Sequence, residues 1–208
     1  MSSSAPPPPD VYFKKRLDYT SGGQQFVFDV GHTIFSSFQI DEGTDLLLRL
    51  LEPPADPPGH ILDLGCGCGV IGIVLARRFP TAHVTLADKD LLAVRYARHN
   101  AACNNIANVT VLGSVGLEHV PDHPYDMIIS NIPAKIGDVA IEQEFILDPL
   151  ARLCPGGVYW CVVVSGLNRL IPKIGVRHQL PLKEVKKRAG HTVYRIIKPT
   201  QEKGASPA

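Results

Sequence analysis

A short glycine-rich segment carries the first sign of chemistry in this sequence. It reads Asp63-Leu64-Gly65-Cys66-Gly67-Cys68-Gly69 and lies between an apolar run at 60–62 and a stretch at 70–79 whose apolar residues recur at helical spacing. The glycines therefore occupy a turn from a strand into a helix. Glycine lets the backbone turn tightly and lets a ligand approach the main chain, and the start of a helix offers free N–H groups. The segment predicts a binding site for a flat or charged small molecule.

Polar residues also follow two later strand-like runs. The run 83–87 ends on Asp88, and an acid at the tip of the second strand suits a pair of hydrogen bonds to a ribose diol. The run 125–130 leads into Asn131-Ile132-Pro133-Ala134. Ligands gather just beyond the carboxyl ends of parallel strands, so both strand ends are candidate binding positions.

The glycine spacing differs from the G-x-G-x-x-G of dinucleotide-binding proteins. With Asp63 in front, it resembles motif I of class I S-adenosylmethionine (SAM) methyltransferases. Asn131-Ile132-Pro133-Ala134 resembles the Asn-Pro-Pro-aromatic motif of methyltransferases that act on planar exocyclic amino groups, with isoleucine and alanine at its second and fourth positions. The resemblance implies SAM as the cofactor and a cofactor site formed by Asp63, Gly65, Cys66, Gly67, Gly69, Asp88, Lys89, Ser114 and Asn131.

The segment ahead of the glycine loop extends the resemblance. Phe35-Ser36, followed by Asp41-Glu42-Gly43-Thr44, is similar to a Phe-Ser pair and an acid-x-Gly-[ST] helix start in the "methyltransferase small" family, which includes RNA guanine-N2 methyltransferases. In that family this segment folds over the cofactor and substrate pocket. Asp88-Lys89-Asp90 also fits the family pattern. Ser114 stands where many relatives have an acid that contacts the adenine amino group, so a backbone carbonyl or the hydroxyl would have to take that role.

The resemblance implies methyl transfer to an exocyclic amino nitrogen of a base in RNA, with guanine N2 of ribosomal RNA as the first choice. Such an amine is a poor nucleophile because its lone pair is delocalised into the ring. We expect the side-chain oxygen of Asn131 and the carbonyl of Ile132 to accept hydrogen bonds from the amine, with Pro133 stiffening the loop, while the site holds nucleophile and methyl group in line. Candidate substrate contacts are Phe35, as a stacking platform in place of the missing aromatic residue, Ala134 and Lys135.

The composition is that of an ordinary globular protein. The chain has 208 residues, 45% of them hydrophobic and 20% charged, and a net charge of +1, so any RNA contact must come from local basic patches. Five cysteines fit neither a disulfide framework nor a four-ligand zinc site, and we expect no metal. Neither a bilayer-spanning apolar run nor the apolar core of a signal peptide is present, which predicts a cytoplasmic protein with no membrane contact.

The fold class predicted from these patterns is α/β. From residue 60 onward strand and helix patterns alternate, which is typical of a mainly parallel sheet with helices on both faces. The runs 182–187 and 191–198 read as a final antiparallel hairpin. Seven strands with a reversed last strand match the Rossmann-like fold of class I methyltransferases. A helix expected over 138–153 should kink or restart at Asp148, because Pro149 lies inside it.

One domain is expected, covering residues 11–200. It divides into an N-terminal extension, 11–58, and a Rossmann-like core, 59–200. Two strand-like runs in the extension flank Gly22-Gly23 and predict a β-hairpin. The proline-rich residues 1–10 and the polar residues 201–208 are expected to be tails.

Two other functions fit the same residues. The altered motif at 131–134 also suits a SAM-dependent methyltransferase of a protein amide side chain or a small molecule, because a pocket without a stacking aromatic need not take a base. A SAM-binding partner or sensor without transfer activity is the third hypothesis, and the presence of Asp63, Asp88 and Asn131 disfavours it. The basic cluster at 14–16 fits RNA phosphates no better than the solvated face of an edge strand. For the cluster at 183–188, the solvated face of a terminal strand is the favoured interpretation and a phosphate contact is the alternative. The oligomeric state stays open.

Overall fold

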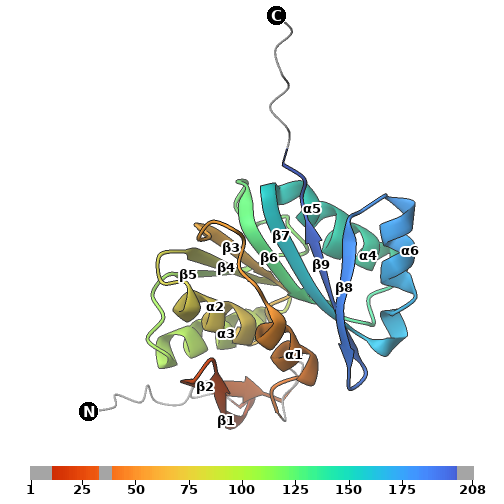
Figure 1. Ribbon diagram of the computed structural model, residues 1–208. Coiled ribbons are helices and arrows are strands. Elements are labelled where there is room, and N and C mark those ends of the chain that lie inside the picture. Colours follow the sequence, from red (N-terminus) through yellow and green to blue (C-terminus); the bar gives the residue numbers. More distant parts are fainter. Residues whose placement is uncertain (1–10, 33–38, 201–208) are drawn as a thin grey trace, which may run out of the picture.

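The computed structural model describes residues 11–32 and 39–200 (Figure 1). Its strands are β1 (Phe13–Ser21), β2 (Gln24–Gly31), β3 (His60–Leu64), β4 (His83–Asp88), β5 (Val109–Gly113), β6 (Tyr125–Asn131), β7 (Leu153–Val164), β8 (Leu182–Arg188) and β9 (His191–Ile197). Its helices are α1 (Glu42–Leu50), α2 (Val70–Arg78), α3 (Leu91–Cys103), α4 (Asp138–Glu142), α5 (Asp148–Arg152) and α6 (Leu170–Arg177), with a π-helical segment η1 (Gln143–Leu147) and a 3₁₀ turn η2 (Ser165–Leu167).

The strands form an antiparallel hairpin and a seven-stranded sheet. The hairpin pairs β1 with β2, and the sheet has the order β5-β4-β3-β6-β7-β9-β8. The first five strands in that order are parallel, whereas β9 runs antiparallel to both β7 and β8. The expected architecture is thereby confirmed, including the N-terminal hairpin and the reversed final strand.

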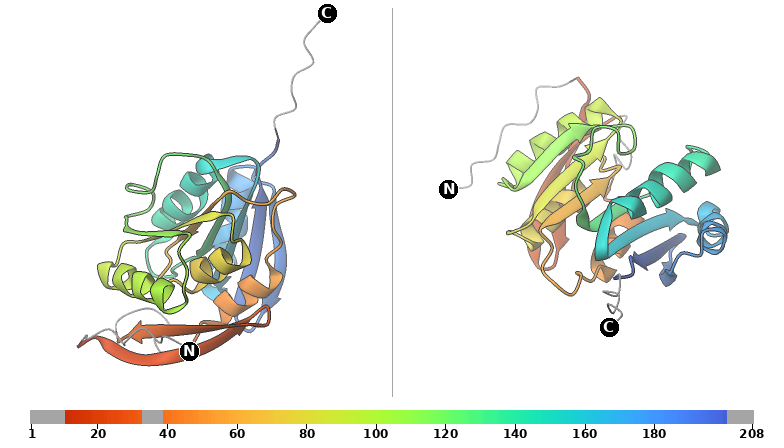
Figure 2. Two further views of the ribbon diagram at one scale, coloured as in Figure 1. Left: turned by 90° about the vertical axis from the view of Figure 1, so that its left-hand side faces the viewer. Right: turned by 90° about the horizontal axis from the view of Figure 1, so that it is seen from above.

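Two hydrophobic cores lie on opposite faces of the sheet, with helices over each (Figure 2). Neighbouring residues of a strand point to opposite faces. Ile129 and Trp160 therefore pack in the core that includes α1, α2 and α3, while Ile128 and Tyr159 pack in the core that includes α4 and α6. Both faces of the central strands are thus buried, which explains their nearly continuous apolar sequence.

Asn100 of α3 and Asn104, the C-cap of that helix, cover one edge of β2. Asn100 accepts a hydrogen bond from the Asp29 N–H at 2.8 Å and donates one to the Asp29 carbonyl at 3.0 Å. Asn104 makes the same pair of bonds with Val27, at 3.0 and 2.7 Å. A neighbouring strand would make bonds of this kind, so the two amides satisfy the backbone groups that the hairpin edge would otherwise leave open.

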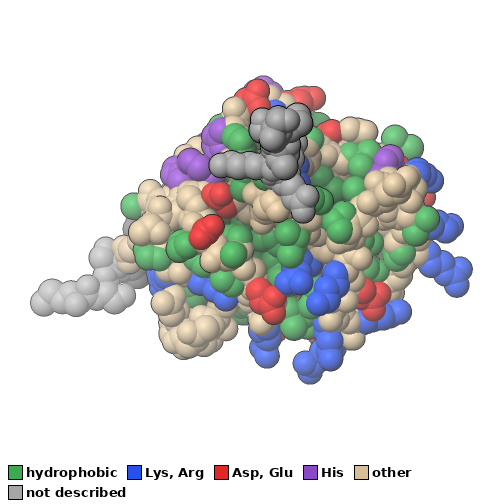
Figure 3. Space-filling view, turned by 45° about the horizontal axis from the view of Figure 1, so that its top comes forward, with side chains coloured by type: hydrophobic (Ala, Val, Ile, Leu, Met, Phe, Trp, Pro, Cys, Tyr) green, Lys and Arg blue, Asp and Glu red, His purple; other side chains and the backbone are tan. Residues whose placement is uncertain are grey.

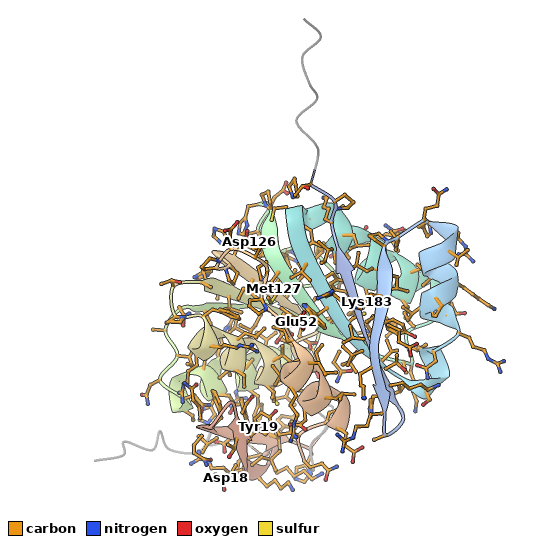
Figure 4. All side chains as sticks on the ribbon, in the orientation of Figure 1. Asp18, Tyr19, Glu52, Asp126, Met127 and Lys183 are labelled. Atoms are coloured by element: carbon orange, nitrogen blue, oxygen red, sulfur yellow. The ribbon has the colours of Figure 1, made fainter. Side chains whose placement is uncertain are left out.

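Charged and polar side chains also fix the hairpin to the core. The buried Asp29 carboxylate accepts two hydrogen bonds from Arg16, at 2.7 and 2.8 Å, and lies 2.7 Å from Nε2 of His99 on α3. Burial by itself would raise the pKa of Asp29, but the hydrogen bonds from Arg16 and His99 lower it below the ordinary value. Tyr19, labelled in Figure 4, donates a hydrogen bond to Asp45 of α1 at 3.0 Å.

The chain after β6 differs in part from expectation. The expected restart with Asp148 as a cap is not seen: the backbone stays helical through a π-helical segment of five residues, and Asp148 is the first residue of α5, with Pro149 in its first turn. Helix α6 was not predicted from the sequence. Its Pro172 lies in the first turn, where no intrahelical N–H bond is needed, so proline is tolerated there. Within the described ranges, no helix combines the length and apolar character needed to cross a bilayer.

Candidate functional site

A pocket of about 360 Å³ lies at the carboxyl ends of the central strands. Its walls include residues that directly follow β3, β4, β5 and β6. Strand β3 pairs with β4 on one side and with β6 on the other, so connections on the two sides diverge from this point. Open α/β sheets bind ligands at such a switch point, and the volume lies within the roughly 300–1,000 Å³ usual for small-molecule sites.

The glycine loop is held tightly against the end of β4. The N–H groups of Gly65 and Cys66 both donate to the carbonyl of Ala87, at 2.8 and 3.1 Å. At the end of the loop Gly69 has a φ of +90°, and a Cβ there would lie 3.0–3.2 Å from Ile73, Ala97 and Leu86. No other residue type fits this position easily, because a side chain would meet both the conformational penalty and the close packing.

Asp88 joins the glycine loop to the turn after β4. Its Oδ2 accepts a hydrogen bond from the Gly67 N–H at 2.8 Å, and its Oδ1 accepts one from the Asp90 N–H at 2.9 Å. Each carboxylate oxygen has a second lone pair for a ligand. Asp88 and Lys89 line the pocket beside Gly65, Cys66 and Gly67, so the structure brings these five predicted residues together.

Asp63 lies beneath the loop and does not line the pocket. The side chain is fully buried; Oδ2 accepts a hydrogen bond from the Gly72 N–H at 2.8 Å, while Oδ1 has no hydrogen-bond partner among the described residues. Burial, only partly offset by that bond, raises the pKa of Asp63 from 3.8 to about 7, and the nearby Asp88 carboxylate adds to the rise. Oδ1 is thus a buried polar atom that the described residues leave unsatisfied.

The raised pKa of Asp63 predicts a pH-dependent loss of stability. The folded protein holds this proton up to about pH 7, whereas the unfolded chain releases it near pH 3.8, so the free energy of unfolding falls as the pH rises between these values. At pH 8 the destabilisation amounts to at most about 4 kcal/mol. We expect Asp63→Asn to remove this fall in the free energy of unfolding, measured by urea denaturation of the ligand-free protein between pH 5 and 8. If the free energies of the two proteins changed in parallel with pH, the raised pKa of Asp63 would be contradicted.

Ser114 lines the pocket at the end of β5, but its hydroxyl is already engaged within its own loop. The hydroxyl donates to the Gly116 carbonyl at 3.0 Å and accepts from the His119 N–H at 3.0 Å. The Ser114 N–H donates to the Asp88 carbonyl at 2.9 Å. Of the two groups that the sequence left open for recognising an adenine, the backbone carbonyl is therefore the better candidate.

Asn131 ends β6 at the opposite side of the pocket. Its Nδ2 donates hydrogen bonds to Oδ2 of Asp41 at 2.8 Å and to Oγ1 of Thr44 at 3.0 Å. The next residue, Ile132, is buried, and its N–H donates to the Val162 carbonyl at 3.0 Å, which continues the sheet by one residue. The loop thus leaves the sheet in a fixed direction although its second residue is not proline.

Most of the charged residues that line the described part of the pocket are acidic. It contains four carboxylates, Asp41, Asp88, Asp90 and Glu144, and one cation, Lys89. Opposite charges favour each other at short range, so the pocket suits a cationic ligand better than a free phosphate. The charge of the lining therefore disfavours a phosphate-binding role for the glycine loop.

Only some of the remaining predicted residues line the pocket. Pro133 and Ala134 line the pocket, whereas Gly69, at the start of α2, and the exposed Lys135 are not among the lining residues. Phe35 lies outside the described residues. All five cysteines are free thiols; burial raises the pKa of Cys68 to about 12 and that of Cys66 well above its ordinary value, so neither is a reactive thiolate.

Several lining residues were not predicted as site residues, and four of them bear on the chemistry of the pocket. Asp41 and Thr44 come from the start of α1, and Glu144 and Phe145 come from η1. Phe145 packs against the glycine loop, since its ring would lie 3.4 Å from a Cβ at Gly65. π-Helical segments often occur at functional sites but have no sequence signature that could have revealed this one.

Comparison with known proteins places this chain among the methyltransferases. A model of the methyltransferase small domain family matches residues 25–195. A ribosomal RNA small subunit methyltransferase C of Pseudomonas aeruginosa is 33% identical over 196 residues, which are 91% of this chain and 57% of the relative. Its namesake in Hahella chejuensis is 39% identical over 142 residues, or 67% of this chain and 39% of the relative.

A solved structure shows the same fold around a ligand pair. A T. thermophilus 16S rRNA N2 methyltransferase, in complex with AdoMet and guanosine, has a TM-score of 0.75 and 25% sequence identity to this chain. The match covers 92% of this chain and 52% of that one. The chain therefore spans about half the length of the relatives it matches.

Proposed function

Because the chain belongs to the methyltransferase small domain family, we propose that it is a SAM-dependent methyltransferase acting on an exocyclic amino nitrogen of a base in RNA, most specifically guanine N2 of ribosomal RNA. The observation that carries the proposal is the meeting of three features on one pocket: the glycine loop, Asp88 and Asn131. The names of the relatives, and the AdoMet and guanosine bound by the T. thermophilus protein, support it.

The residues of the pocket fit SAM as the cofactor. The loop 65–69, supported from below by Asp63, would hold the methionine portion, Asp88 the ribose, and the main chain at Ser114 the adenine. The acidic lining suits a ligand that carries positive charge. When bound, SAM supplies a methyl group activated by a sulfonium.

Asn131 and Ile132 would hold the accepting amine. The Asn131 amide nitrogen is occupied by Asp41 and Thr44, so the amide oxygen is the atom left to accept a hydrogen bond from a substrate amino group. The carbonyl of Ile132 is the second proposed acceptor. Two such bonds draw the amine lone pair out of conjugation and fix its direction, and positioning of this kind supplies much of the rate enhancement in a displacement reaction.

A base in this pocket needs a flat surface to stack on. Ala134 cannot provide one, and among the described lining residues Phe145 alone is aromatic. We therefore add Phe145 to Phe35 as a candidate stacking platform, with Pro133 and Ala134 as the rim beside the base. An offset contact between a base and an aromatic ring typically contributes about 1–3 kcal/mol.

Basic residues outside the pocket would contact RNA phosphates. Strand β8 exposes Lys183, Lys186, Lys187 and Arg188, and Figure 4 labels Lys183 on this strand. On the face drawn in Figure 3, Lys and Arg side chains gather along the lower and right-hand margins. Together with Lys135, they are the proposed local basic patches that a chain of net charge +1 needs for binding RNA.

Replacing Asp88 with alanine is expected to weaken SAM binding by about ten- to a hundredfold. The change removes a charged acceptor proposed to bind the ribose, and such hydrogen bonds contribute about 1.5–3 kcal/mol. Isothermal titration with SAM measures the effect. Asp122→Ala, which removes an exposed acid outside the pocket lining, is the matched control, and an affinity equal to that of the control would sink the ribose assignment.

The proposed function is tested by transfer of labelled methyl groups. The purified chain and labelled SAM are incubated in two separate reactions, one with total RNA and one with total protein from cells in which the gene has been deleted. Label in RNA that nucleoside mass spectrometry identifies as N2-methylguanosine supports the proposal. Label in protein would favour the hypothesis of a protein amide substrate, and SAM binding without transfer to either pool would favour a sensor.

Two broader proposals accompany this function. We propose that residues 11–200 act as one domain, because the hairpin is tied to α3 and the start of α1 contributes to the pocket. We also propose a cytoplasmic location, where ribosomal RNA would be accessible, as the names of the relatives suggest.

A further inference from the structure

The side chain of Asn131 is held by residues that lie 90 and 87 positions earlier in the chain. Its Nδ2 is 2.8 Å from Oδ2 of Asp41 and 3.0 Å from Oγ1 of Thr44, at the start of α1. An amide nitrogen carries two hydrogens, and these two contacts use both. The Asn131 amide is therefore not a free side chain on the pocket wall.

The chemistry of Asp41 decides which way the Asn131 amide faces. The two ends of an amide are similar in shape, and their orientation must be inferred from hydrogen-bond partners. A carboxylate only accepts hydrogen bonds, so the amide nitrogen must face Asp41. The oxygen then points away from Asp41 and Thr44 and is left for a ligand. Turned the other way, the amide would set its oxygen against a carboxylate and offer the pocket a donor.

Asp41 is itself held by its surroundings. As the N-cap of α1, its Oδ2 also accepts a hydrogen bond from the Thr44 N–H at 2.9 Å. Its Oδ1 faces Nε2 of His191, on β9, at 3.9 Å. Gly43 allows this close arrangement, because a Cβ there would lie 2.6 Å from Cδ2 of His191 and 2.9 Å from Oδ2 of Asp41. The carboxylate is thereby fixed between α1, β6 and β9.

We propose that Asp41, assisted by Thr44, is a positioning residue that orients the amide of Asn131 so that its oxygen accepts the substrate amino group. This inference rests on the proposed function for its catalytic meaning. It gives the acid and the hydroxyl of the helix start Asp41-Glu42-Gly43-Thr44 a specific role, because both act on the substrate through Asn131. It also explains why residue 43 is glycine, since a side chain at this position would displace the orienting carboxylate.

A kinetic comparison tests the positioning role. Asp41→Ser keeps a good N-cap but removes the carboxylate, and we expect kcat for RNA methylation at saturating SAM to fall about ten- to a hundredfold. Asp41→Asn keeps an acceptor oxygen in place and is expected to recover most of that loss. In an Asn131→Ala background Asp41→Ser should cause no further loss, because its effect passes through Asn131. An equal loss in both backgrounds would overturn the proposal.

A second measurement does not depend on activity. In ¹⁵N-labelled protein, the Asn131 side-chain amide is identified as the signal that Asn131→Ala removes. Its hydrogens are expected to exchange with solvent at least about tenfold more slowly in the wild type than in Asp41→Ser, because both are hydrogen-bonded. Equal exchange rates would overturn the orientation itself. Slow exchange together with no methylation of RNA would instead reject the proposed function and leave the orientation standing.

Discussion

Asn131→Ala lowers the turnover of methyl transfer to RNA by about a hundredfold or more and leaves the affinity for SAM unchanged. The expected loss is large because the side chain supplies one of the two proposed acceptors that hold the amine, and its oxygen is oriented before substrate arrives. Single-turnover methylation with saturating SAM measures the effect, and isothermal titration checks the cofactor.

A distant asparagine provides the control for this change. Asn168 accepts a hydrogen bond from Thr192 at 2.7 Å and does not line the pocket, so Asn168→Ala should retain wild-type turnover. If Asn131→Ala also turns over at the wild-type rate, Asn131 has no part in the mechanism. If it loses SAM binding as well, its role is structural support of the pocket.

Asn100→Ala is expected to lower the free energy of unfolding by about 3 kcal/mol. The buried Asn100 side chain makes three hydrogen bonds, two with the backbone of Asp29 and one to the carbonyl of Cys68 in the glycine loop at 2.9 Å. Each contributes about 1 kcal/mol, and a buried group left without a partner adds to the loss. Urea unfolding measures the change.

The hairpin itself offers a control for the Asn100 variant. Gln25 lies exposed on β2, where its side chain accepts a hydrogen bond from the Thr20 hydroxyl at 3.1 Å. Because that bond is open to solvent, Gln25→Ala should change stability by less than about 0.5 kcal/mol. A loss below about 1 kcal/mol for Asn100→Ala would mean that water replaces its amide, and that the hairpin edge does not depend on α3.

The regular core could be predicted from sequence because local patterns and tertiary packing agree there. Strands β8 and β9 begin at residues 182 and 191, where the two predicted runs of the final hairpin begin. Asp63, the glycines, Asp88 and Asn131 could be identified because each lies near the carboxyl end of a strand or in the turn just beyond it. In a parallel sheet, that position alone brings residues from different strands to one edge.

The parts that sequence did not reveal depend on contacts between distant segments. Asp41 could be predicted as a helix cap, but its second contact, with Asn131, exists because α1 packs against the sheet. The contacts of Asn100 and Asn104 with β2 were not predicted, since nothing local shows that a strand passes beside these two residues. Glu144 and Phe145 reach the pocket through a π-helical segment that apolar spacing does not distinguish from an α-helix.

The place of β9 between β7 and β8 affects how the protein is made. A ribosome delivers β7 and β8 before β9, yet β8 pairs within the sheet with β9 alone, and β7 has its second edge covered by it. Until residues 191–197 emerge, the nascent chain carries an open edge along the apolar strand that contains Tyr159 and Trp160. Such edges recruit other chains. This half of the sheet can therefore assemble only after residues 191–197 are available. A chain truncated before residue 191 would be an aggregation-prone intermediate and not a smaller folded protein.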